Sequence, residues 1–510
     1  MKNQKLIRIM ALIIVIVLAI TPSFSALASS DLTYKRTCPT IKVNGFMSND
    51  IYKNIGTQSE EKVFGISGDV IFDLVKDCIP ALARFVVDRD WDKLGETVTP
   101  IASACFEDIM LDSNGEPKDN SGAKFIYPEP NEIKKDSVLP FKYDWRLDPL
   151  VIAKELNDYI DYVLECSGAE KVALDCHSLG GVIVITYVSV YGYEKIHGVV
   201  FNSTAIYGET YTGELLTGQL VLSKESVTEY LRYALDQTEY ENLINGIIDI
   251  LSSAGIFNAL LPLADDIILN LSEYLIPEVF APIFGGWLTI WAMIPDEYID
   301  EAMDYIFNDV YEGSDEYDGL IEKIENYNNT VRKNKTETVK ETEKNCRVGV
   351  YSRYGYSSIL VTPSWQNVSD GTIDTKYASF GATTAKYGEK LSDEYLANVD
   401  EKYISPDKTI DASTCLFPEK TWFVKYLKHA DNCKNLQELT NAILFADETV
   451  TIDSYESYPQ YLINDTETDV IRAETENDNM GIYEQSTFLK IFTYLIELVR
   501  RVLESVINFI

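Results

Sequence analysis

A short stretch, LDCHSLGGVIVI at residues 174–185, restricts how this chain can fold. It differs at one position from the G-x-S-x-G elbow, in which a serine occupies a strained turn between a strand and a helix. The strand and helix backbones approach closely two positions before and after the serine, so small side chains are required there. Gly180 meets that requirement, while Cys176 replaces the first glycine. The stretch predicts that Ser178 lies above a sheet as a nucleophile.

Cys176 is compatible with the elbow, because an unpaired cysteine is compact and packs as a small hydrophobic residue. Residues 171–175 are apolar enough for a short buried strand, and residues 182–187 for the first turns of a buried helix. We therefore assign Cys176 a packing role beside the site. The alternative is a plain strand–turn–helix in which Ser178 merely caps the helix.

The N-terminus predicts export. Three basic residues begin the chain, an apolar stretch follows at 9–20, and residues 26–28 (Ala-Leu-Ala) form a small-residue cleavage site. This order is typical of a secretory signal peptide, so we assign residues 1–28 to one and expect a secreted, bacterial protein. The alternative is a retained N-terminal anchor, although the apolar stretch is short for a membrane span.

The charge argues against several kinds of partner. The chain carries a formal net charge of −36 over 510 residues, which argues against nucleic acid and against electrostatic binding to anionic lipid.

No motif implies a metal or a cofactor. Export permits disulfides, but the sequence does not determine whether Cys415 and Cys433, on either side of His429, form one.

Strand-like and helical segments alternate along much of the chain. Helical spacing is found at 152–166, and residues 60–110 also have helical character. Strands are expected at 39–43, 138–143, 171–175, 196–202, 347–351 and 421–426. Such alternation predicts an α/β fold whose mostly parallel sheet has helices on both faces. Together with the elbow, it predicts an α/β-hydrolase fold.

The alternation is interrupted at 209–345 by a helical and partly very apolar insertion. An insertion of this length between sheet elements is typical of a cap or lid. Its uncharged run at 279–294 is too short for a membrane span. Trp287 and Trp291 have the apolar body and polar edge that suit a membrane–water boundary, and we expect the cap to contact lipid there. The alternative is a helical subdomain with its own dry core.

The chain therefore divides into five parts. These are a signal peptide (1–28), the first part of the core (29–208), a helical cap with connecting helices (209–345), the second part of the core (346–464), and an acidic linker with a C-terminal amphipathic helix (465–510). That last helix, at 486–510, has one apolar face, which either docks on the body or binds a membrane interface.

A nucleophilic serine needs a base within hydrogen-bond reach and an acid that orients the base. The chain has three histidines. His177 precedes the serine on the elbow and cannot turn back onto it, and His197 begins a strand at the far end of the sheet. His429 follows the last predicted strand, where the chain order Ser…Asp…His of these hydrolases requires the base.

The acid should stand between the nucleophile and the base in the chain. The segment 368–374 supplies Asp370 and Asp374, and we prefer Asp370 because the Asp-Gly pair places its carboxylate on a tight turn. An oxyanion hole needs two backbone N–H groups. We expect the N–H of Leu179, next after the serine, and that of Phe46, which follows Gly45 in the loop after the first strand.

Four blocks in this order, PTIKVNGF, PFKYDWRLDP, CHSLGG and SDGTI, resemble the lecithin:cholesterol acyltransferase group of α/β-hydrolases, which includes lysosomal phospholipase A2. The resemblance covers roughly residues 38–205 and 345–432. It implies the same nucleophile, acid, base and oxyanion positions. It also implies that Asp144 and Arg146 form a structural ion pair beside the site. The chain departs from the family at Asn44, where a proline is usual, and at Cys176.

These observations predict a secreted serine esterase, lipase or phospholipase that acts on acyl esters, with lipid as the expected substrate. One alternative is an O-acyltransferase, because both reactions pass through the same acyl-enzyme. A second alternative, from another class, is a non-catalytic lipid- or surface-binding protein that kept the fold. The three candidate triad residues, Ser178, Asp370 and His429, argue against the latter.

Overall fold

The structure is a computed structural model. It describes residues 32–64, 90–221, 276–359, 361–433, 435–465 and 470–475, together with Ala81, Arg84, Ser226 and Asp478. The proposed signal peptide and the proposed C-terminal helix at 486–510 lie outside these residues, as does most of the cap segment 222–275. None of the described helices is long and apolar enough to cross a membrane.

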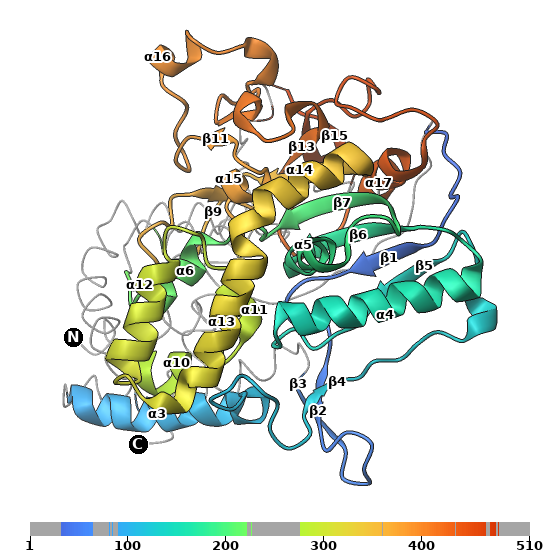
Figure 1. Ribbon diagram of the computed structural model, residues 1–510. Coiled ribbons are helices and arrows are strands. Elements are labelled where there is room, and N and C mark those ends of the chain that lie inside the picture. Colours follow the sequence, from blue (N-terminus) through green and yellow to red (C-terminus); the bar gives the residue numbers. More distant parts are fainter. Residues whose placement is uncertain are drawn as a thin grey trace, which may run out of the picture.

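Within the described residues, eight strands form one sheet in the order β15-β14-β13-β8-β7-β6-β1-β5 (Figure 1). Neighbouring strands run parallel throughout, except that β15 is antiparallel to β14. The strands are β1 (Thr40–Val43), β5 (Val138–Phe141), β6 (Val172–Ser178), β7 (Ile196–Thr204), β8 (Arg347–Tyr354), β13 (Thr421–Lys425), β14 (Tyr461–Asp465) and β15 (Val470–Ala473). The predicted α/β fold with a mostly parallel sheet is confirmed.

Helices cover both faces of this sheet because side chains alternate between its faces along each strand. In β6, Val172 and Leu174 join one buried cluster, whereas Ala173 between them joins the other. The first cluster is covered by α4 (Pro149–Ser167), α5 (Leu179–Tyr191) and α14 (Lys335–Asn345), and the second by α17 (Leu436–Phe445). Parallel strands with both faces covered are rich in apolar residues, and β6 and β7 bury apolar side chains toward both clusters.

The described part of the insertion is helical. It comprises α6 (Thr210–Leu216), η3 (Ile276–Phe280), α10 (Ala281–Phe284), α11 (Leu288–Ala292), α12 (Ile299–Met303), η4 (Asp304–Val310) and α13 (Asp318–Thr330), which leads to α14. Trp287 and Trp291 are 0% and 1% exposed. These two indoles therefore belong to the interior of the described protein, which favours the alternative of a packed helical subdomain at this position.

The remaining elements lie around the sheet. They are β2 (Ile51–Lys53), β3 (Glu61–Phe64) and β4 (Gly122–Ala123), α3 (Trp91–Phe106), the pair β9 (Tyr356–Ser357) and β10 (Val368–Ser369), α15 (Thr375–Ala378), the pair β11 (Thr383–Thr384) and β12 (Ile410–Asp411), and α16 (Asp393–Leu396).

Two expectations from the sequence are corrected here. The helix expected from residue 60 does not begin there, because residues 61–64 form β3, which pairs with β2. The second part of the core does not end at residue 464, since β15 extends the main sheet into the segment expected to be an acidic linker. Ile471 is buried there, so the strand has an apolar contact with the core although acidic residues surround it in the sequence.

Candidate active site

The elbow forms where β6 passes directly into α5. Ser178 is the junction residue, and its φ of 57° and ψ of −129° are outside the regions that non-glycine residues normally occupy. Such strain persists only where the surrounding structure enforces it, and it is concentrated at functional sites. Ser178 is 4% exposed. Because α5 begins at Leu179, the N–H of Leu179 has no partner within the helix and points out of the N-terminal end of α5, where Ser178 lies.

Three glycines make room for this turn. A Cβ on Gly180 would lie 1.9 Å from the Val43 carbonyl oxygen, so the start of α5 rests directly on the end of β1. A Cβ on Gly45 would lie 2.4 Å from Cβ of Ser178, and one on Gly181 would lie 2.4 Å from Cβ of Thr204. The structure thus brings the loop after β1 against the serine.

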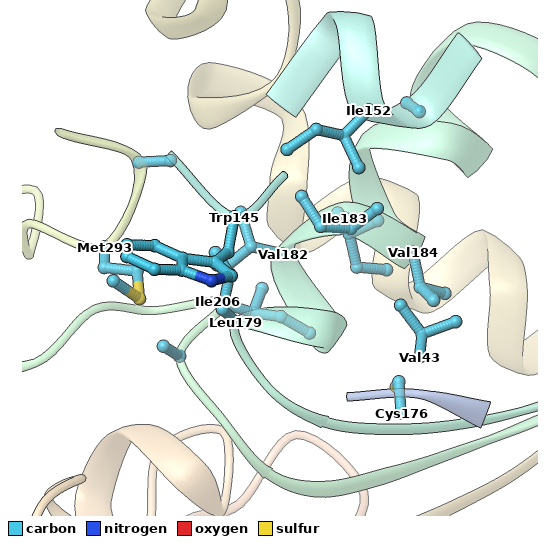
Figure 2. Packing of buried hydrophobic residues seen from close by; sticks show 14 of the residues in the cluster. Val43, Trp145, Ile152, Cys176, Leu179, Val182, Ile183, Val184, Ile206 and Met293 are labelled. Carbon is cyan, nitrogen blue, oxygen red and sulfur yellow. The ribbon is translucent and has the colours of Figure 1, made fainter. Parts of the chain in front are cut away.

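Cys176 is fully buried in the sheet beneath the elbow. It is the register partner of Val43 on β1, and Figure 2 shows the two side chains next to each other under the first turns of α5. Its thiol donates a hydrogen bond to the Val200 carbonyl oxygen at 3.2 Å. Burial raises the pKa of Cys176 well above its ordinary value, so the thiol stays protonated and acts in packing.

His429 and Asp370 form a hydrogen-bonded pair on adjacent loops. Nδ1 of His429 lies 2.7 Å from Oδ2 of Asp370. Asp370 is fully buried, and its Oδ1 accepts backbone N–H groups of Thr372 and Ile373 at 3.0 and 2.8 Å. Burial alone would raise the pKa of this carboxyl group, but His429, Arg353 and the backbone donors hold it below its ordinary value. Asp370 is therefore ionised where it meets the imidazole.

The carboxylate of Asp374, the other candidate acid, binds Thr210. Its Oδ2 accepts hydrogen bonds from the backbone N–H of Thr210, at 3.2 Å, and from the Thr210 hydroxyl. Burial raises the pKa of Asp374. The side chain therefore ties the segment after β10 to the start of α6.

The other two histidines have different surroundings. The His177 ring lies against that of His429, with ring centroids 4.5 Å apart. Burial, with the neighbouring His429 and Arg353, lowers the pKa of His177 far enough to keep this ring neutral. Nε2 of His197 lies 2.9 Å from the Leu444 carbonyl oxygen, and its ring stacks on Phe445 of α17. The tilted contact of the two rings places the chain neighbour of the nucleophile, His177, against the candidate base, His429.

The loop that carries Phe46 is fixed by the segment after β5. The Tyr143 hydroxyl donates to the Asn44 carbonyl oxygen at 2.5 Å, and Nε1 of Trp145 donates to the Asn49 carbonyl oxygen at 2.9 Å. The Phe46 ring packs edge-on against Trp145, with centroids 4.7 Å apart. Tyr143 and Trp145 belong to the YDWR block, so this block holds the loop that adjoins Ser178.

Asp144 and Arg146 form a buried ion pair. Two bonds link them, from Nε to Oδ1 at 2.9 Å and from Nη2 to Oδ2 at 2.6 Å. Arg146 also donates to the Ile109 carbonyl oxygen at 3.0 Å. A buried arginine paired in this two-bonded way fixes loop geometry, which is the role that the family resemblance implied for this pair.

Two buried charged residues at the site were missed by sequence reasoning. Glu209 follows β7 and is 2% exposed; burial raises its pKa to about 7, against the opposing effects of Tyr211 and His429. Arg353 lies near the end of β8 and is also 2% exposed. Neither belongs to a motif. The available signal was position alone, because Arg353 and Glu209 follow the strands predicted at 347–351 and 196–202, and sites of parallel sheets form beyond the carboxyl ends of the strands.

No protein-family model matches the sequence, and no curated protein matches it. Among solved structures, the crystal structure of the Tle4–Tli4 complex is similar to a part of this chain, with 14% sequence identity and a TM-score of 0.21. The match covers 35% of this chain and 48% of that chain, so the present chain spans about half the length of that relative. An overlap of this extent identifies no family, and the α/β assignment rests on the sheet itself.

Proposed function

We propose that the protein is a serine hydrolase that cleaves carboxylic esters through an acyl-enzyme on Ser178. One observation carries the proposal: Ser178 is a strained serine at the start of α5, and the ring of its chain neighbour His177 lies against the ring of His429, which is bonded to a buried, ionised aspartate. Ser178 and His429 stand at or after the carboxyl ends of the parallel strands β6 and β13, where active sites of such sheets lie. Asp370 comes from the loop after β10, outside the main sheet.

In the proposed reaction, Oγ of Ser178 attacks the ester carbonyl carbon while Nε2 of His429 takes the hydroxyl proton. Asp370 holds the ring through Nδ1 and stabilises the imidazolium that forms. When the tetrahedral intermediate collapses, the C–O bond of the alcohol breaks and His429 returns the proton to the leaving oxygen. A water molecule then repeats the sequence on the acyl-enzyme, releasing the acid and restoring Ser178.

The N–H groups of Leu179 and Phe46 are proposed to stabilise the negative oxygen of the intermediate. Support comes from the start of α5 at Leu179 and from the close approach of Gly45 to Ser178. The fixed loop geometry, maintained by Tyr143 and Trp145, is the preorganisation that such a site requires.

An apolar acyl group is the proposed substrate moiety, and lipid esters are the proposed class. The rings of Phe46, Trp145 and Trp287 pack together beside the proposed oxyanion loop, with centroid separations of 4.7 to 5.7 Å. The blocks shared with the lecithin:cholesterol acyltransferase group point to the same substrate class. Export, proposed from residues 1–28, is compatible with such a role outside the cell.

A fluorophosphonate probe tests the proposal, because only an activated serine is labelled. We expect the full chain to be labelled on Ser178, and Ser178→Ala and His429→Ala to lose both labelling and hydrolysis by about 10⁴-fold or more. Absence of labelling in the wild type would point to a non-catalytic binding protein. Hydrolysis assays that include a long-chain alcohol separate the remaining alternative, since an acyltransferase would form the new ester.

A further inference from the structure

The Arg353 side chain, near the carboxyl end of β8, is a buried cation with an unusual set of partners. Its Nη1 lies 2.6 Å from the carbonyl oxygen of Lys428, 2.9 Å from that of His429 and 2.9 Å from that of Asp431. Its Nε donates to Oδ1 of Asn202, at the end of β7, at 3.1 Å. Within the described part of the chain, no carboxylate forms an ion pair with it.

These carbonyl groups all belong to the turn that carries the candidate base. The same turn is held by a bond from the His429 backbone N–H to the Asp370 carbonyl oxygen at 3.0 Å, and by one from Asp431 to Lys428 at 3.1 Å. A guanidinium group has donors in a fixed planar fork. Arg353 therefore defines where the backbone of His429 lies relative to strand β8.

The charge of Arg353 acts on the same pair. Asp370 is fully buried, and an unpaired carboxylate in such a place would take up a proton. His429 first, and then Arg353, stabilise its ionised form. Among the described residues, Glu209 and Tyr211 also face this carboxylate, and the His177 ring lies against His429. Glu209 and Tyr211 are not cations and burial keeps His177 neutral, so Arg353 supplies the permanent positive charge beside the pair. Asp431 and Asp175 face Arg353 itself.

We propose that Arg353 is a positioning residue for the active site: it fixes the turn that presents His429 and places a permanent positive charge beside the Asp370–His429 pair. The inference rests on the proposed function for the role of His429 as base. Arg353 touches no reacting atom and acts only through the Asp370–His429 pair.

The test compares Arg353→Met, which removes the charge and the fork, with Arg353→Lys, which keeps only the charge. We expect kcat to fall about 10²-fold or more in Arg353→Met with KM nearly unchanged, because misplacing a catalytic group costs on this order. The acid limb of kcat/KM should move to higher pH, since protonation of the pair becomes easier without the cation. Arg353→Lys should lower kcat about tenfold and leave the acid limb in place.

Arg332 offers a matched control. It is 7% exposed, and it donates to the carbonyl oxygens of Trp291 and Ile294 at 2.5 Å each, away from the proposed triad. Arg332→Met should lower the unfolding temperature without lowering kcat and without moving the pH profile. If Arg353→Met shows the same kcat and pH profile as Arg332→Met, Arg353 is merely structural and the inference is overturned. Where Arg353→Met does not fold, Arg353→Lys is compared with Arg332→Met in the same way.

Histidine NMR gives a readout that does not require turnover. With three histidines in the chain, the low-field Nδ1–H signal of His429 bonded to Asp370 can be assigned by a His429 substitution. We expect this signal in the resting wild type and its loss or broadening in Arg353→Met. An unchanged signal would contradict the inference. A signal that depends on Arg353 in a protein that is neither labelled nor active would refute the proposed function alone.

Discussion

His429 is bound to Asp370 at two points: its Nδ1 lies 2.7 Å from the carboxylate, and its backbone N–H donates to the Asp370 carbonyl oxygen at 3.0 Å. The turn after β13 and the turn after β10 are thus joined as one unit. The side-chain bond sets the orientation of the imidazole ring, and the backbone bond sets the distance between the two turns. Substituting the carboxylate should therefore change the chemistry of the pair more than its position.

Exchanging the two candidate acids for amides separates their roles. Asp370→Asn should lower ester hydrolysis by about 10⁴-fold, because the amide favours the wrong imidazole tautomer while the backbone bond stays in place. Asp374→Asn should keep activity within about tenfold, since Asp374 binds Thr210 instead. The measurement is kcat/KM with one soluble ester. A larger loss for Asp374→Asn would move the proposed acid to that position.

How far the sequence predicts this site depends on how far apart in the chain the interacting residues are. The elbow is local, so the residues around Ser178 were sufficient to predict a strand–turn–helix. Chain order was sufficient to nominate His429, and Asp370 was preferred from its place in an Asp-Gly turn. Arg353 could not be found in this way, because its partners come from β7 and from the turn after β13. Its role depends on strand neighbours that only the sheet order defines.

The same distinction holds for the fold. The parallel strands β1, β5, β6, β7, β8 and β13 were predicted from apolar runs, which are a local signal, whereas the parallel strand β14 was not predicted. The edge strand β15 was missed because its acidic surroundings resemble a linker, and its pairing with β14 depends on a neighbour in space. The burial of Trp287 and Trp291 was likewise undetermined by composition, since an apolar stretch fits a core as well as an interface.

Gly180 should tolerate no side chain. In Gly180→Ala the new Cβ would lie 1.9 Å from the Val43 carbonyl oxygen, and the end of β1 cannot move without shifting the loop that adjoins Ser178. We expect a loss of about 3 kcal/mol or more in unfolding free energy and a large loss of activity. Gly286→Ala is the control, because its Cβ would meet no heavy atom nearer than 3.5 Å. Urea unfolding measures the stability of both variants, and ester hydrolysis measures their activity. Equal losses of stability and activity in the two variants would contradict the close packing at the elbow.

Cys176 should be replaceable by a smaller residue but not by a larger one. Cys176→Ala loses the bond to the Val200 carbonyl oxygen and leaves a small cavity, so we expect a cost of about 1–2 kcal/mol with activity within about tenfold. Cys176→Leu should cost more in both respects, because the site beneath α5 is filled. A loss of activity in Cys176→Ala as large as that in Ser178→Ala would assign the thiol a chemical role.

Glu209 should make the stability of the protein depend on pH. Burial raises its pKa from 4.5 to about 7 in the folded chain, so the folded state binds this proton more tightly than the unfolded state does. Stability from this group is present in full below pH 4.5, and it is lost as the pH rises through about 7. Above that pH the loss should be on the order of 3 kcal/mol.

The substitution Glu209→Gln removes this titration while keeping the shape of the side chain. Below pH 4.5 the variant should differ from the wild type by a constant amount, which reflects the altered hydrogen bonds with Thr212 and Tyr211. Between pH 4.5 and about 8 the variant should gain steadily on the wild type, because only the wild type must ionise a buried carboxyl group as the pH rises. Unfolding free energies measured in urea at several pH values give this difference directly. Since the constant part cancels, a difference that does not change with pH would show that Glu209 is solvated or paired in solution.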